Sequence, residues 1–346
     1  MAGKGKKGII LVVIAASVFA LIYFGITLTS NLGKSDKEIS AEDAGRKLNK
    51  LYKEIDVTVA DTVKGQIDLD PADIGESLPD IAKFPVSVDN TTDSFEEIFY
   101  STGKSGTGND GGLNEVAAAF NDARIMIGGK QASVRIRNIA SGTATDYIRS
   151  GTYIPDAFTP SNELWGEMVK ASGTPAELIT KRMTGNVAGV VTNKKKYDEL
   201  VGKYGSLNVK TITDAIAGNE LSMGYTDPFA SSTGLNFLVT ALGTFDSSDL
   251  LSDKAVQGFE RFQANVPFIA STSLHMRDAA KTGQLDAFVL EYQTYVNAPD
   301  PKSGYVFTPF GVRHDRPIYA LGNLPREKED ILHKFAEFTE QDQYQK

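Results

Sequence analysis

The chain has 346 residues, of which 41% are hydrophobic and 23% are charged, and it carries a formal net charge of −8 and no cysteine. The hydrophobic share suffices for packed cores, and the length indicates two domains at about 150 residues each. A chain without cysteine has no disulfide, no thiolate metal site, no cysteine nucleophile and no lipid anchor on cysteine. The excess of acidic residues argues against nucleic acid as a partner.

A basic leader precedes a long apolar segment at the N-terminus. Lys4, Lys6 and Lys7 stand before residues 8–28, GIILVVIAASVFALIYFGITL, which carry no charge. A hydrocarbon core of about 30 Å takes about 20 helical residues, so this segment is long enough to span a membrane. The lysines place residues 1–7 in the cytoplasm. We therefore expect a single-pass protein of the cell membrane whose body is extracellular.

A cleaved secretory signal is the alternative for residues 8–28, although its apolar core would normally be about 7–15 residues long. Residues 29–90, which follow, are polar, with Pro71, Pro79 and Pro85 set among acidic residues. We interpret them as a stalk or linker. The alternative is a partly ordered segment that packs on the body.

From about residue 94, strand-like and helix-like patterns alternate along the chain. Strands are predicted over 95–100, 132–140, 155–158, 187–191, 222–225, 285–290, 305–310 and 317–321. Helices are predicted over 112–120, 145–149, 163–170, 195–204, 211–217, 235–242, 255–263 and 326–338. This alternation indicates an α/β protein in which right-handed crossovers join parallel strands.

Small and hydroxyl-bearing residues follow several predicted strands. They occupy the loops 101–106, 141–143, 159–162, 227–234 and 291–293. In open α/β sheets ligands bind beyond the carboxyl ends of the strands, where helix N-termini offer free N–H groups. Serine and threonine before a helix are more often N-caps than ligands, but their recurrence predicts one shared cleft. Ser105, Ser161 and Asn162 are candidate binding residues on this ground, with Trp165 one turn further on.

Several segments from about Ser94 to the end carry a family resemblance. They are VRIRNIASGTATDYI, YIPDAFTPSNELW, NVAGVVTNKKKYDEL, MGYTDPFASSTGLNFL, GQLDAFVLEY, RPIYAL and the terminal KFAEFTEQDQ. This part of the chain resembles the bacterial extracellular solute-binding proteins, the two-lobed receptors of ATP-binding-cassette (ABC) importers. The resemblance implies a periplasmic-binding-protein-like fold of the second topological class, each lobe a mixed sheet flanked by helices. It also implies that residues 91–184 begin the first lobe, 185–290 form the second, and 291–346 return to the first.

The resemblance implies a function and a site as well. A small solute, an oxyanion or another polar molecule, would be captured between the lobes by hinge closure and passed to an ABC permease. Ser141, Gly142 and Thr143 would line the first lobe, Asp227, Ser231, Ser232 and Thr233 would face them, and Glu291 and Tyr292 would lie near the hinge. No metal, cofactor or catalytic residue is implied. Iron-binding relatives offer adjacent tyrosines, whereas Tyr292 and Tyr295 are separated here.

Motifs for other chemistries are incomplete. Gly103-Lys104-Ser105 lacks the glycine that a phosphate-binding loop needs five positions earlier, where Ile98 stands. The three histidines show no zinc spacing, and no nucleophile elbow occurs. We therefore expect no enzyme. Trp165, the single tryptophan, is either a core anchor or a stacking surface for the ligand.

Two alternatives stay open. The two-lobed body can serve adhesion, assembly or sensing at the cell surface without transport. Some members that the chain resembles carry a von Willebrand factor type A domain downstream. The Asp-x-Ser-x-Ser metal motif of that domain is absent here, and the chain can be a fragment of a longer protein.

Overall fold

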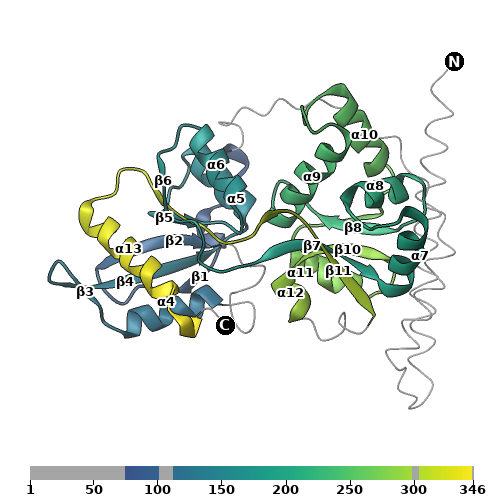
Figure 1. The fold of residues 1–346 in the computed structure, drawn as a ribbon. Coiled ribbons are helices and arrows are strands. Elements are labelled where there is room, and N and C mark those ends of the chain that lie inside the picture. The colour runs from purple at the N-terminus through teal and green to yellow at the C-terminus, as the bar shows by residue number, and fades with distance from the viewer. Residues whose placement is uncertain (1–74, 101–111, 298–303, 345–346) are drawn as a thin grey trace, which may run out of the picture. The chain divides into compact units, whose positions relative to one another are not determined.

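The computed structural model describes residues 75–100, 112–297 and 304–344 (Figure 1). The predicted span over 8–28, most of the predicted stalk, and Ser105 lie outside the described residues. Residues 66–346 form one compact unit. Among the described helices, none combines the length and the apolar character needed to cross a membrane.

The first lobe is built on a mixed seven-stranded sheet. Its strands are β1 (Val86–Val88), β2 (Ser94–Tyr100), β3 (Met126–Ile127), β4 (Lys130–Asn138), β5 (Ala157–Thr159), β6 (Ala176–Thr180) and β12 (Ile318–Leu321). They run in the order β1-β4-β2-β5-β12-β6, with β3 paired to β4. The central strand β2 is parallel to β4 and to β5, whereas β12 is antiparallel to β5 and to β6.

Helices cover both faces of this sheet (Figure 1). They are α4 (Gly112–Asp122), α5 (Ser141–Ser150), α6 (Glu163–Ala171) and α13 (Arg326–Thr339), with short 3-10 turns at Ile81–Lys83 and Asp342–Tyr344. Helix α4 buries Leu113, Val116, Ala117 and Phe120 on one side, as the apolar spacing predicts. These residues and α13 cover Val134 and Ile136 of β4, while α5 and α6 pack on the opposite face.

The second lobe is built on a five-stranded sheet in the order β11-β7-β10-β8-β9. The strands are β7 (Val187–Asn193), β8 (Met223–Thr226), β9 (Phe268–Ala270), β10 (Ala287–Glu291) and β11 (Tyr305–Arg313). Its helices are α7 (Lys194–Tyr204), α8 (Val209–Ala217), α9 (Ser232–Phe245), α10 (Asp253–Gln263), α11 (Ser273–Ala280) and α12 (Tyr292–Val296). Helices α7 to α10 contribute to one hydrophobic core, and α11 and α12 to another.

Strand β11 corrects one predicted boundary. The sequence analysis assigns all of residues 291–346 to the first lobe, whereas β11 belongs to the second. It pairs along its length with β7, and Phe310 packs edge-on against Phe237 in the core of the second lobe. The chain therefore rejoins the first sheet only after Arg313, at β12. The pairs of β2 with β4 and β5 and of β8 with β10 and β9 are parallel as expected, but both sheets also contain antiparallel pairs, among them β10 with β7 at the centre of the second sheet, that the alternation of strands and helices does not predict.

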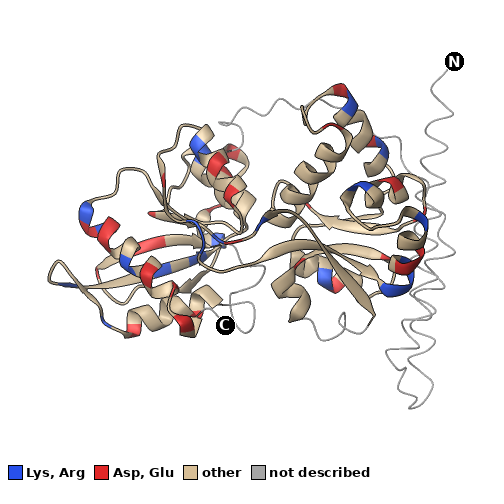
Figure 2. Ribbon diagram, viewed as in Figure 1, with Lys and Arg blue, Asp and Glu red and all other residues tan. Residues whose placement is uncertain are grey.

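Charged residues of both signs lie along the outer helices α7, α10 and α13 (Figure 2). Many form exposed pairs within one helix, such as Lys196 with Glu199 at 2.9 Å and Lys334 with Glu337 at 2.7 Å. Exposed pairs of this kind contribute little to stability, because water and salt screen them. The Lys194–Lys196 run is therefore part of a solvated helix surface, as its composition indicates.

Candidate functional site

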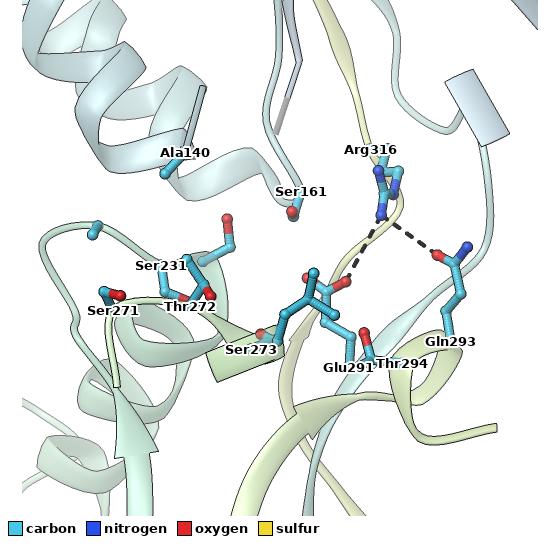
Figure 3. Close-up of a pocket in the computed structure, with 13 residues that line it drawn as sticks. Ala140, Ser161, Ser231, Ser271, Thr272, Ser273, Glu291, Gln293, Thr294 and Arg316 are labelled. Carbon is cyan, nitrogen blue, oxygen red and sulfur yellow. Dashed lines mark hydrogen bonds and ion pairs between the residues drawn. The ribbon is translucent and has the colours of Figure 1, made fainter. Parts of the chain in front are cut away.

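A small pocket lies where loops of the two lobes meet (Figure 3). Its volume is about 60 Å³, and it is lined by Ala140, Ser161, Ala230, Ser231, Ser232, Ser271, Thr272, Ser273, Leu274, Glu291, Gln293, Thr294 and Arg316. A single water needs roughly 10–15 Å³ on this measure, so the pocket holds a few waters or one compact solute. Hydroxyl groups dominate its lining.

Most of these hydroxyls are already oriented by a neighbour. Ser232 Oγ accepts from Trp165 Nε1 at 2.9 Å and donates to Ser141 Oγ at 3.0 Å. Ser273 Oγ pairs with Thr233 Oγ1 at 3.0 Å. Fixed hydroxyls of this kind form a polar wall whose geometry does not need to reorganise when a solute enters.

Helices α5 and α9 begin at the pocket without side-chain caps, whereas α11, which also begins there, is capped by Thr272. Helices α7, α8, α10 and α11 begin with a side chain that accepts a backbone N–H, namely Asn193, Asn208, Ser252 and Thr272. Within the described part of the chain, no side chain caps α5 or α9, whose N-cap residues Ala140 and Ser231 both line the pocket. Helices α6, α12 and α13 also begin without a side-chain cap. Uncapped N–H groups at the start of α9 carry partial positive charge and are available to an anion.

Glu291 and Arg316 form the polar floor of the pocket (Figure 3). Glu291 Oε1 lies 2.8 Å from His314 Nδ1, and Oε2 accepts from Asn186 Nδ2 at 3.1 Å. Burial raises the pKa of Glu291, whereas the hydrogen bond with His314 and the charge of Arg316, whose Nη2 lies 3.8 Å from Oε2, lower it. The donors around its two oxygens favour the ionised form of the carboxyl group.

Arg316 reaches both lobes. Its guanidinium donates to the hydroxyl of Tyr100 in β2 and, at 3.4 Å, to Gln293 Oε1 in α12. Its backbone adopts a left-handed φ of 53°, which non-glycine residues rarely adopt, and its N–H donates to Ser161 O at 3.1 Å. This bend aims the side chain across the junction between the two sheets.

The lobes touch directly beside the pocket. Gly142 N donates to Ala230 O at 3.1 Å, next to the bonds that join Ser141 and Trp165 to Ser232. A Cβ atom at Gly142 would overlap the carbonyl oxygen of Phe229, so only glycine allows this approach. The structure therefore shows the two lobes in contact.

The residues singled out from the sequence fall into three groups. Ser161, Ser231, Ser232 and Glu291 line the pocket; Ser141, Gly142, Asn162 and Trp165 make contacts between the lobes beside it; Thr143, Asp227, Thr233 and Tyr292 do not line it. Trp165 is buried in the hydrophobic core that includes Phe158 and Tyr319. Of the two roles predicted for it, this position corresponds to the core anchor. Tyr292 lines a different cavity of about 600 Å³ together with Tyr100.

Several lining residues escape the sequence patterns. Ser271, Thr272 and Ser273 form a loop of hydroxyl residues before a helix, but the preceding strand β9 has only three residues and gives no periodic pattern that would predict it. Gln293 belongs to the predicted loop 291–293 but is not among the predicted binding residues. No local sequence pattern predicts a role for Arg316. It lies on the segment between β11 and β12, and only the packing of the two sheets brings its side chain to the pocket.

Comparisons with known proteins identify the family. The family described as bacterial extracellular solute-binding protein matches residues 105–346, and the chain belongs to it. A periplasmic thiamin binding protein has the same fold, with a TM-score of 0.51 and 12% identity over 73% of this chain and 80% of that one. Iron-bound HitA from Pseudomonas aeruginosa has a TM-score of 0.51 and 15% identity over 72% and 82%.

The sulfate-binding protein SubI from Mycobacterium tuberculosis H37Rv is also similar, with a TM-score of 0.49 and 11% identity over 72% of this chain and 83% of that one. At these identities the similarities concern the fold alone. No curated protein sequence matches the chain significantly. The family is one of binding proteins, which supports binding rather than catalysis. In the described ranges, no three His, Asp or Glu side chains gather as a metal site would require.

Proposed function

We propose that this protein is a membrane-tethered extracellular receptor that captures a compact anionic solute between its lobes and delivers it to an ABC importer. The observation that carries the proposal is the pocket of about 60 Å³ at the junction of the two lobes. Its position beyond the strand ends, between two α/β lobes, is where such folds bind ligands. The apolar segment over 8–28 supplies the tether, and the family supplies the importer as partner.

The size and the polarity of the pocket favour a small solute. Seven serine and threonine residues line it, and Leu274 is the one large apolar side chain among the lining residues. A ligand with an extended apolar part would displace water from this polar lining without replacing the hydrogen bonds of that water, which costs free energy. An oxyanion, in contrast, accepts hydrogen bonds from hydroxyl and N–H groups at once.

The charge balance favours an anion. Glu291 is negative, but His314 and Asn186 bind its oxygens and Arg316 lies 3.8 Å away, so its charge is compensated within the floor. The N-terminus of α9 adds partial positive charge, and among the residues that the structure describes no side chain caps it. A ligand that accepts hydrogen bonds is therefore favoured over one that only donates them.

Thermal unfolding of the detergent-solubilised full chain tests this proposal. The panel comprises sulfate, phosphate, molybdate and nitrate, with glucose, glycine and thiamine as comparison solutes at equal ionic strength. A ligand at 100 times its Kd stabilises the folded state by about 2.7 kcal/mol, so an oxyanion is expected to raise the Tm clearly. A rise with the comparison solutes only would refute the anionic ligand, and no rise at all would refute solute capture.

A further inference from the structure

His314 lies behind the pocket, at the point where the chain passes between the lobes. Its side chain is 0% exposed, and it stands on the segment that joins β11 to β12. Its backbone N–H donates at 3.0 Å to the carbonyl of Asn186, which lies on the other segment between the sheets, from β6 to β7. Both crossings of the chain are therefore tied together at this histidine.

One asparagine fixes the protonation of the imidazole ring. Asn236 Oδ1 accepts from Val312 N at 2.9 Å, and Asn236 Nδ2 donates to Val312 O at 2.8 Å. This two-point match to the backbone excludes a flipped amide. The amide nitrogen of Asn236 therefore faces His314 Nε2 at 3.1 Å, and because an amide nitrogen only donates, Nε2 must be the acceptor.

A second asparagine, from the other lobe, meets the same ring nitrogen. Asn162 Nδ2 lies 3.2 Å from His314 Nε2 and 3.3 Å from Ser232 O, and a flipped amide would turn an oxygen toward that carbonyl. Asn162 precedes α6 of the first lobe, while Asn236 is part of α9 of the second. With Nε2 accepting, the ring proton is on Nδ1, which donates to Glu291 Oε1 at 2.8 Å.

We propose that neutral His314, protonated on Nδ1, is a positioning residue that couples contact between the lobes to the orientation of Glu291 in the pocket. Its Nε2 holds one asparagine from each lobe, and its Nδ1–H holds the carboxylate. Separation of the lobes removes the Asn162 donor, so Asn236 alone then holds Nε2, and the orientation of Glu291 Oε1 becomes less fixed while Asn186 still holds Oε2. The role in solute binding rests on the proposed function, whereas the tautomer and the link between the lobes do not.

Nitrogen NMR of the imidazole rings tests the tautomer without any ligand. The chain has three histidines, so a histidine-labelled full chain gives few signals, and the variant His314→Gln identifies the one from His314. At neutral pH we expect a neutral ring with a protonated Nδ1 and an unprotonated Nε2. A proton on Nε2, in either the neutral or the charged ring, would overturn the proposal.

Fluorescence of Trp165, the single tryptophan, reports contact between the lobes, because its Nε1–H donates to Ser232 of the other lobe. In His314→Leu, which keeps bulk but removes both hydrogen-bonding nitrogens, we expect emission at longer wavelength. In His314→Gln, which keeps one acceptor and one donor, we expect emission close to that of the wild type. His333→Leu, on the exposed side of α13, is the matched control and leaves the emission unchanged.

Sulfate serves as the probe for binding. If the wild type binds it, His314→Leu weakens the affinity about tenfold or more, the effect of losing a hydrogen bond to a charged group, and His314→Gln restores most of it. If sulfate does not bind the wild type, that outcome counts against the proposed function and leaves the tautomer and emission tests to decide on His314. Equal emission wavelengths of His314→Leu and wild type would overturn the coupling. If His314→Leu does not fold, emission of His314→Gln at longer wavelength than the wild type, or a ring proton on Nε2, would overturn the proposal.

Discussion

At the scale of single residues, a missing Cβ atom and a buried carboxyl group stand out. Gly142 allows the backbones of the two lobes to meet, and its N–H donates to Ala230. Glu96 is 0% exposed in β2, and neither of its carboxyl oxygens has a hydrogen-bond partner among the described residues. Substitution of Gly142 is expected to affect contact between the lobes, and substitution of Glu96 is expected to affect the stability of the fold. The two properties can therefore be tested separately.

Gly142→Ala is expected to hold the lobes apart. The added methyl group overlaps Phe229 O, and relief of such overpacking typically costs about 1–3 kcal/mol, which corresponds to roughly ten- to a hundredfold weaker binding. Isothermal titration with an oxyanion that binds the wild type measures the loss. Gly202→Ala in α7, where a Cβ meets nothing within 4 Å, is the control and retains full affinity. Equal affinities of both variants would show that this approach is not required.

Glu96→Gln is expected to stabilise the protein at neutral and alkaline pH. Burial, with a contribution from nearby Asp156 that Lys328 partly offsets, raises the pKa of Glu96 from 4.5 to about 9. The unfolded chain loses this proton above pH 4.5 while the folded protein keeps it, so stability is full below pH 4.5 and falls as pH rises toward 9. Glutamine removes that loss, a gain on the order of 3 kcal/mol at pH 7 and near zero at pH 4.

Chemical denaturation of wild type and Glu96→Gln across this pH range measures the gain. Glu115→Gln, on the exposed side of α4, is the control and follows the wild type at every pH. A constant difference between Glu96→Gln and wild type from pH 4 to pH 8 would contradict a shifted carboxyl and point to packing alone.

At the scale of helices and strands, the missing side-chain cap at the start of α9 lowers stability and leaves backbone N–H groups available to a ligand. Ser231 is its N-cap residue, yet its hydroxyl accepts no backbone N–H. Ser231→Asp supplies a carboxylate that caps the helix and is expected to add about 1 kcal/mol of stability. The same carboxylate occupies the place of an anionic solute, so oxyanion affinity is expected to fall at least tenfold by like-charge repulsion.

Thermal unfolding and titration on the same sample measure both effects of Ser231→Asp. Asn193→Asp is the matched control, because Asn193 already caps α7 away from the pocket and its replacement changes neither property by much. A gain in stability without loss of affinity would place the anion elsewhere.

The elements also show which parts of the fold are predictable from sequence. Long elements with regular burial, such as α4 and α13, follow from apolar spacing alone, and β7 follows from its apolar run. Strand β9 has three residues, two of them exposed, so it gives no periodic signal, and the hydroxyl loop after it was missed. The membership of β11 is set by pairing with β7 across more than a hundred residues of sequence, which no local pattern encodes.

The candidate site follows the same rule. Ser161, Ser231, Ser232 and Glu291 follow directly after strands or begin helices, so their local position predicts their role as lining residues. Arg316 and His314 act through contacts with residues far apart in the chain, such as Tyr100 and Asn162. Sequence patterns identify the loops that meet at the junction, whereas only the packed structure shows which side chains connect the lobes.

At the scale of the whole molecule, the proposed function requires an equilibrium between separated and touching lobes. The chain has no cysteine, so an engineered disulfide reports that equilibrium without competing thiols. Ser141 Oγ and Ser232 Oγ lie 3.0 Å apart across the junction, near enough for a bridge whose sulfur atoms are about 2.05 Å apart. Ser141→Cys with Ser232→Cys is therefore expected to cross-link when the lobes touch and to stay reduced when they separate.

The cross-linking rate under mild oxidant, followed by electrophoretic mobility, measures this occupancy of the touching state. A bound solute stabilises the touching lobes by its differential affinity for them, so the rate is expected to rise in the presence of an oxyanion that raises the Tm. Each single cysteine variant is the control and forms no internal bridge. A rate that is equal with and without the oxyanion would contradict capture by closure, because a ligand with equal affinity for both arrangements shifts nothing.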